Sequence, residues 1–139
     1  MTLAMGAANI SLHREIPSRL AEVDMLCREI RSLLVDNGLG EVSFPVELAA
    51  RECLNNAVIH GNRCDASKKV ALNLQFGRKW IFLRVSDEGS GFDWRKVRRA
   101  PPPDKAIISG RGLSIAALYA QRIRFNRRGN QVTLWLKRR

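Results

Sequence analysis

The apolar residues of this chain change their spacing at about residue 70, and this change limits the folds that the sequence can adopt. Between residues 20 and 61 they recur at three- and four-residue intervals, which is typical of amphipathic helices. We expect a first helix to follow Pro17, with Ser18 as its N-cap, and to end at Asn37-Gly38. A second helix is predicted at residues 44–61.

Beyond residue 69 the apolar residues alternate with small or polar ones, which predicts strands. Residues 70–76 and 80–86 alternate on either side of a short turn and indicate an antiparallel hairpin. Further strands are predicted at residues 8–13, 123–126 and 131–136. This order of elements predicts an α+β fold in which the helices cover one face of the sheet.

The size and composition of the chain predict a single domain over residues 1–139. The 45% of hydrophobic residues can form a core without disulfides or a structural metal. Cys27, Cys53 and Cys64 are odd in number and lack C-x-x-C spacing, so we expect neither a disulfide framework nor a zinc site. A reducing cytoplasm fits this cysteine usage. No uncharged apolar run approaches the ~18 residues that span a bilayer, so we expect a soluble protein without a membrane segment.

The formal net charge of +11 favours an anionic partner, which can be nucleic acid, an anionic lipid surface or an acidic protein. The basic residues concentrate at residues 95–99, 122–128 and 137–139. Aromatic residues make up only 6% of the chain, and no nucleic-acid recognition motif accompanies the basic runs. We therefore expect no direct nucleic-acid binding and favour a solvated basic face or a dock for an acidic protein.

Polar residues form one ridge on the second predicted helix, because Glu52, Asn56 and His60 lie four residues apart. Burial of a carboxylate and an amide costs several kcal/mol unless something pairs with them. The ridge is therefore predicted to face a cleft that holds a metal, a phosphate or a reacting hydroxyl. An exposed helix face is the alternative, although the apolar neighbours count against it. For His60 an ordinary helix-end histidine explains the sequence equally well.

Two glycine-containing segments follow the ridge along the chain. Asp87-Glu88-Gly89-Ser90-Gly91 ends the second strand of the hairpin, and Gly110-Arg111-Gly112 precedes a third predicted helix. Each segment alone has a purely structural explanation: the first can be a common turn, and the second can be a loop before a helix. The combination with the polar ridge is much more specific, because together the three segments supply the separate parts of an ATP site.

The chemistry of these residue types suggests how such a site works. A carboxylate at a strand end, here Asp87, can accept a hydrogen bond from the adenine amino group. Backbone N–H groups at the start of the third predicted helix can hold phosphate oxygens. Asn56 offers a neutral oxygen to Mg²⁺, which bridges phosphates. Glu52 is then placed to take a proton from an attacking hydroxyl as a general base.

Three segments of the chain look like the N, G1 and G2 boxes of a superfamily of ATPases that includes gyrase, heat-shock 90 chaperones, histidine kinases and mismatch-repair proteins. These segments are Glu52-x-x-x-Asn56-Ala57-x-x-His60-Gly61, Asp87-x-Gly89-x-Gly91-Phe92-Asp93 and Gly110-Arg111-Gly112-Leu113. Within the superfamily, the chain resembles the bacterial anti-sigma factor serine kinases of partner-switching systems. The resemblance implies a two-layer α/β sandwich with a mixed, mostly antiparallel sheet.

The resemblance also implies a function. It implies a kinase that transfers the γ-phosphate of ATP, with Mg²⁺, to a serine of an anti-anti-sigma (STAS-domain) protein and otherwise sequesters a sigma factor. Glu52 would be the catalytic base and Asn56 the metal ligand. The residues implied in nucleotide binding are Asn56, Asp87, Gly89, Gly91, Gly110, Arg111, Gly112 and Leu113. Homodimerisation is also plausible for this family.

Some assignments remain open at the level of sequence. Arg111 can equally be a solvated arginine or a partner contact, Asn62 a helix C-cap, and Thr133 a plain strand residue rather than a group near the adenine. The connector at residues 92–109 is short and rich in proline, and Gly129-Asn130 lacks the threonine often found after that glycine. The alternative function is therefore a nucleotide-dependent or nucleotide-free binding module with little or no kinase activity.

Overall fold

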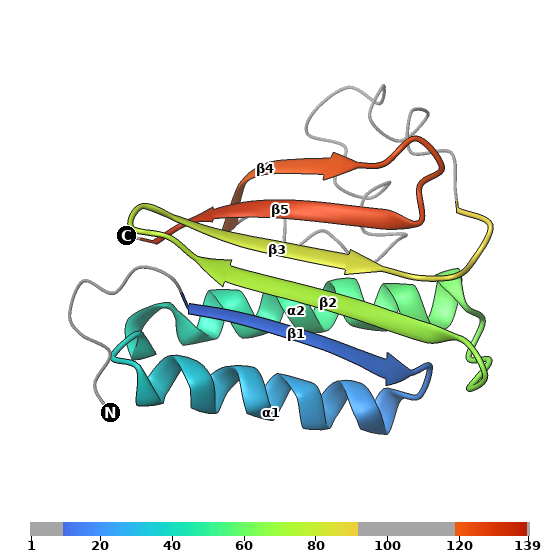
Figure 1. Ribbon diagram of the computed structural model, residues 1–139, viewed down its shortest axis with the longest axis horizontal. Coiled ribbons are helices and arrows are strands. Elements are labelled where there is room, and N and C mark those ends of the chain that lie inside the picture. Colours follow the sequence, from blue (N-terminus) through green and yellow to red (C-terminus); the bar gives the residue numbers. More distant parts are fainter. Residues whose placement is uncertain (1–9, 92–118, 139) are drawn as a thin grey trace.

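Five strands form one sheet, and two long helices lie against one of its faces (Figure 1). This computed structural model describes residues 10–91 and 119–138. The strands are β1 (Ile10–Pro17), β2 (Lys69–Phe76), β3 (Trp80–Ser86), β4 (Ala120–Phe125) and β5 (Gln131–Lys137). The helices are α1 (Leu20–Asp36) and α2 (Ser43–Asn56), with a 3₁₀ turn η1 (Gly40–Val42) before α2 and a π turn η2 (Ala57–Gly61) after it.

The strand order in the sheet is β1-β2-β3-β5-β4, and every pairing between these strands is antiparallel. The predicted β2–β3 hairpin is confirmed. The last two predicted strands, β4 and β5, also pair with each other. β5 lies between β3 and β4, so the chain crosses from the centre of the sheet to its edge and then returns. The predicted α+β fold with helices on one face of a mostly antiparallel sheet is confirmed.

The core lies between the sheet and the two helices. Alternate strand residues such as Leu72, Leu83 and Leu134 point to the helices and are fully buried. The buried residues of α1 recur at helical spacing and are Val23, Leu26, Cys27, Ile30 and Leu34. Those of α2 include the small residues Ala49, Ala50 and Cys53, and this helix contacts β3 directly. The polar residues at the end of α2 are thereby held next to the end of β3.

Ion pairs connect the outer surfaces of α1 and α2. Arg31 donates two hydrogen bonds to the Glu47 carboxylate, at 2.7 and 2.8 Å, and Arg51 pairs with Asp24. The hydrogen bonds from Arg31 hold the pKa of Glu47 below its usual value of 4.5. These contacts connect the two helices to each other.

The start of α1 differs from the sequence prediction. β1 extends four residues further than residue 13, and its last residue is Pro17. The N-cap of α1 is Arg19, which makes no side-chain cap, so the prediction that Ser18 caps the helix is wrong. The Ser18 hydroxyl instead donates to the Lys68 carbonyl at 2.7 Å, because the longer β1 carries it beside the start of β2.

Two further predictions concern the helices. The second helix was predicted to end at Gly61, and the π turn does end there. The third helix, predicted to follow Gly112 and to include Tyr119, falls outside the described residues except for Tyr119, which is helical. Among the helices of residues 10–91 and 119–138, none has the length and apolar character needed to cross a bilayer.

Candidate functional site

The predicted polar ridge lies where α2 ends and the π turn begins. Asn56 is the last residue of α2, and Glu52 lies one helical turn before it. The Oδ1 atom of Asn56 is buried, yet it accepts no hydrogen bond from the part of the chain that the structure describes. Since a buried acceptor without a partner costs ~1–3 kcal/mol, this oxygen is suited to an external ligand.

A hollow of about 250 Å³, including its open mouth, lies beside Asn56. Three segments that are distant in sequence line it: the end of α2, the end of β3, and the turn between β4 and β5. The lining residues are Cys53, Asn56, Ala57, Val85, Asp87, Phe125, Gly129, Asn130, Gln131 and Val132. The structure therefore brings Asn56 and Asp87 together, as the sequence predicted, and adds the β4–β5 turn as a third wall.

Asp87 is packed tightly against the glycine that ends the π turn. A Cβ atom on Gly61 would lie 2.3 Å from the Asp87 carboxyl group, and one on Gly89 would lie 2.1 Å from the Gly61 carbonyl oxygen. The Gly89 N–H donates to Asp87 Oδ1 at 2.8 Å and orients the carboxylate. The two glycines are therefore required by the close approach of the π turn to the loop that carries Asp87.

Asn62, the C-cap of the π turn, holds this loop from one side. The residue is 1% exposed. Its Nδ2 donates to Ser18 Oγ at 2.9 Å and to the Lys69 carbonyl at 3.0 Å, and its Oδ1 accepts from the Glu88 N–H at 2.8 Å. A helix C-cap was one sequence interpretation of Asn62, and the residue does occupy that position. Its side chain additionally connects Ser18, which follows β1, with β2 and the loop after β3.

The β4–β5 turn holds the same loop from the other side. The Asp87 N–H donates to the Asn130 carbonyl at 2.9 Å, and Asn130 Nδ2 donates to the Asp87 carbonyl at 3.1 Å. Asn126 Oδ1 accepts from three successive N–H groups, those of Gly129, Asn130 and Gln131, and so keeps the turn in shape. The loop that carries Asp87 is thus held by two asparagines, by Asn62 at Glu88 and by Asn130 at Asp87.

A positive φ at Gly91 closes the loop against the turn. Gly91 has φ +88°, and a Cβ atom there would lie 1.8 Å from the Arg128 carbonyl oxygen. The sequence singled out Gly89 and Gly91 for approach to a nucleotide. In the structure both also approach other parts of the chain, so packing alone already requires glycine at these two positions.

The apolar side of the hollow includes a cysteine and an aromatic ring that sequence reasoning did not select. Burial raises the pKa of the Cys53 thiol well above its usual range, so the group is a neutral thiol at physiological pH. Phe125 extends from the end of β4. Because adenine is flat and largely apolar, a wall of this kind beside a carboxylate suits an adenine base. Their only signal in the sequence was their place on apolar faces, which most core residues share.

Several predicted residues lie away from this hollow. Glu52 is half-buried and does not line it, and His60 is exposed. Thr133 lies on the opposite face of the sheet, where its hydroxyl accepts from Arg84 Nε at 3.1 Å, so the interpretation as a plain strand residue fits. Gly110, Arg111, Gly112 and Leu113 fall outside the described residues, so the expected phosphate side of the site stays a prediction.

Two comparisons with known proteins bear on this site. The model of one protein family, described as the histidine kinase-like ATPase domain, matches residues 16–136. A search of curated proteins gave no match. The matched range includes all three walls of the hollow.

Proposed function

The chain belongs to the histidine kinase-like ATPase family, and on this premise we propose that it is an ATP-dependent protein serine kinase. Its second role in this proposal is to sequester a sigma factor. The phosphate acceptor is a serine of an anti-anti-sigma protein with a STAS domain. The assignment to a serine kinase rests on the resemblance of the Glu52, Asp87 and Gly110 segments to that class of kinase.

The observation that carries the ATP-binding part of the proposal is the buried Oδ1 of Asn56. It is a neutral oxygen with no partner among the described residues, and it lines the same hollow as Asp87. Mg²⁺ prefers oxygen ligands and keeps most of its coordination for water and phosphates, so one amide oxygen fits it. Bound there, Mg²⁺ would neutralise charge on the ATP phosphates. Asp87 would accept a hydrogen bond from the adenine amino group.

Glu52 has the role of general base in this proposal. The acceptor serine gives its hydroxyl proton to the Glu52 carboxylate while its oxygen forms the new bond to the γ-phosphorus. The bond between that phosphorus and the β–γ bridging oxygen breaks, and ADP leaves. Since Glu52 lies one turn from Asn56 on a rigid helix, the distance between the base and the metal ligand is set by α2 itself.

The kinase step is tested by incubating the purified protein with Mg·ATP and a serine-bearing STAS-domain protein from the same organism. We expect transfer of phosphate to one serine, loss of at least most of that transfer in Glu52→Gln, and full transfer in the control Glu41→Gln. Glu41 is an exposed carboxylate in η1, so its removal changes the net charge equally. Undiminished transfer by Glu52→Gln would remove Glu52 from the role of base.

A second candidate function is a nucleotide-gated binding module without kinase activity. One observation favours it: Glu52 does not line the hollow that Asn56 and Asp87 share. In that case ATP binds and changes the affinity for the sigma factor or the STAS-domain protein, but no ADP forms. Calorimetric binding of ATP together with an unmodified STAS serine would support this second function over the first.

A further inference from the structure

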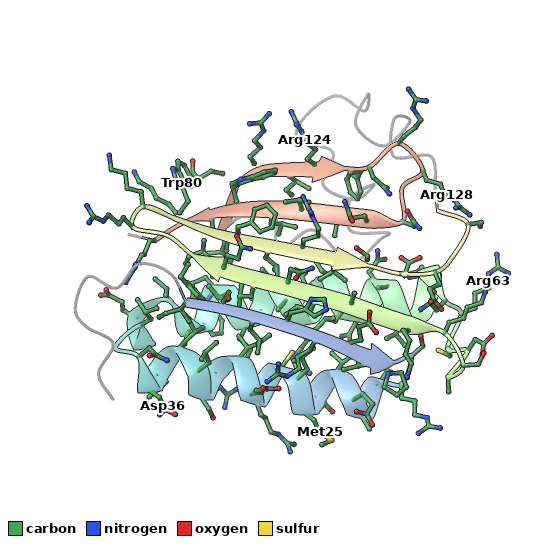
Figure 2. The ribbon with its side chains drawn as sticks, viewed as in Figure 1. Met25, Asp36, Arg63, Trp80, Arg124 and Arg128 are labelled. Atoms are coloured by element: carbon green, nitrogen blue, oxygen red, sulfur yellow. The ribbon has the colours of Figure 1, made fainter. Side chains whose placement is uncertain are left out.

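The face of the sheet opposite the helices carries a row of arginines and aromatic rings. Alternation along β3, β4 and β5 directs these side chains away from α1 and α2. No described helix covers this face, which Figure 2 views directly, with Trp80 at one end of the sheet and Arg124 on β4. We call the group formed by Phe82, Arg84, Arg122, Arg124, Thr133 and Trp135 the basic aromatic face.

The side chains of the basic aromatic face are ordered by contacts among themselves. Phe82 and Trp135 meet edge to face, with ring centroids 5.6 Å apart. The Arg84 guanidinium lies 4.9 Å from the Phe82 centroid, and that of Arg122 lies 5.4 Å from the Trp135 ring centroid. Arg84 also donates from Nε to the Thr133 hydroxyl. Arg84 is therefore held by a ring contact and a hydrogen bond, and Arg122 by a ring contact.

No described carboxylate neutralises this face. The ion pairs within residues 10–91 and 119–138 involve other arginines, and none includes Arg84, Arg122 or Arg124. The residues directly beside Arg84 in the sheet are Asn73 and Thr133, both uncharged. An ordered guanidinium presents planar pairs of N–H donors that match a carboxylate. The face is thus complementary in charge and geometry to acidic side chains.

We propose that the basic aromatic face is a docking site for an acidic segment of another protein. The stacked arginines argue against a nucleobase platform, because each of the two rings already has an arginine over it and bases bind such platforms by stacking on open rings. Like charges argue against a second copy of this chain, since Arg84, Arg122 and Arg124 would meet their own equivalents. The proposal concerns the far side of the sheet and does not depend on nucleotide binding.

The test measures binding of a fluorescent peptide of alternating glutamate and serine, without nucleotide, at about 0.15 M salt. The variant Arg84→Gln/Arg122→Gln removes two charges from the face, and the control Arg28→Gln/Arg63→Gln removes two exposed charges elsewhere. We expect the dissociation constant to rise about tenfold or more in the face variant, and only about twofold in the control, through the general field of the protein. Asn56→Ala should leave peptide binding unchanged.

The variant Arg84→Lys/Arg122→Lys keeps the charge but loses the planar, stacked donors. It should weaken peptide binding about threefold or more, which distinguishes the effect of the arginine geometry from that of positive charge alone. It also provides a test if the glutamine variant does not fold. Absence of peptide binding, or equal losses in the face and control variants, would overturn the proposal. Tighter binding of single-stranded oligothymidine through this face, or a dimer that dissociates in the face variant, would also overturn it.

Discussion

Replacement of Asn56 by alanine should make the nucleotide-free protein more stable while it removes binding of Mg·ATP. The buried Oδ1 has no partner among the described residues, and such an acceptor costs ~1–3 kcal/mol. Alanine is also the better helix former by roughly 0.5 kcal/mol. The lost contacts of the small amide group offset part of this gain. We therefore expect the free energy of unfolding to rise by about 1 kcal/mol, or Tm by about 4 °C for a domain of this size.

Urea unfolding followed by tryptophan fluorescence measures both effects. For the unaltered protein, Mg·ATP at about 100 times its dissociation constant should add ~2.7 kcal/mol to the free energy of unfolding. For Asn56→Ala most of that increment should disappear. The control is Asn55→Ala, which changes the same residue type on the same helix but does not line the hollow. It should keep the Mg·ATP increment.

Two results would refute this reasoning. If Asn56→Ala without nucleotide is less stable by more than about 1 kcal/mol, the Asn56 oxygen is engaged in the folded protein and is not held ready for a ligand. If Mg·ATP stabilises the variant as much as the unaltered protein, Asn56 is not a ligand of the metal–nucleotide complex. The first result concerns the site geometry and the second concerns the function.

Three other changes test how the site is held and how the helices pair. Asn62→Ala should lower the free energy of unfolding by about 3 kcal/mol in urea titrations, because three buried hydrogen bonds are lost; Asn37→Ala, which removes one bond to a carbonyl, should cost about 1 kcal/mol. Gly61→Ala should displace the Asp87 carboxyl group and weaken ATP binding in calorimetry about tenfold. The dissociation constants of ADP and GDP should also become more alike. Glu47 has a folded pKa below its unfolded value of 4.5, so its contribution to stability is present above pH 4.5 and is lost as the pH falls through the folded pKa. The Tm of Glu47→Gln should therefore depend less on pH below 4.5 than that of the unaltered protein. An unchanged acid dependence of Tm would contradict this.

The main elements of the fold could be predicted from the sequence because their hydrophobic patterns are local and regular. α1 and the β2–β3 hairpin show clear helical and alternating spacing, and both lie close to the predicted positions. The cap of α1 could not be predicted in the same way. Ser18 fits a local capping rule, but β1 is long enough to place its hydroxyl against Lys68, which is distant in sequence.

The candidate site was predictable only where a motif supplied the residues. Asn56 and Asp87 were selected because their spacing and neighbours matched an ATP site, and the structure does bring them to one hollow. Asn130 and Cys53 were not selected as site residues. Asn130 contributes mainly through its backbone and through a hydrogen bond from its side-chain Nδ2 to the Asp87 carbonyl, and Cys53 contributes apolar surface. Such roles depend on which segments meet in space, which no local pattern encodes.

The π turn after α2 explains how one short segment lies beside both Asn56, the proposed metal ligand, and Asp87, the proposed partner of adenine. In an α-helix, residues five apart such as Asn56 and Gly61 differ by about 140° around the axis, because a turn takes about 3.6 residues. The π turn instead closes with a hydrogen bond from the Asn62 N–H to the Ala57 carbonyl, at 2.8 Å, across five residues. This wider turn reduces the angular separation, so Asn56 faces the hollow while Gly61 lies directly against Asp87. Restoration of regular α-helical geometry here, for instance by deletion of one residue from the π turn, should therefore separate the Asp87 loop from α2 and abolish nucleotide binding even where the protein still folds.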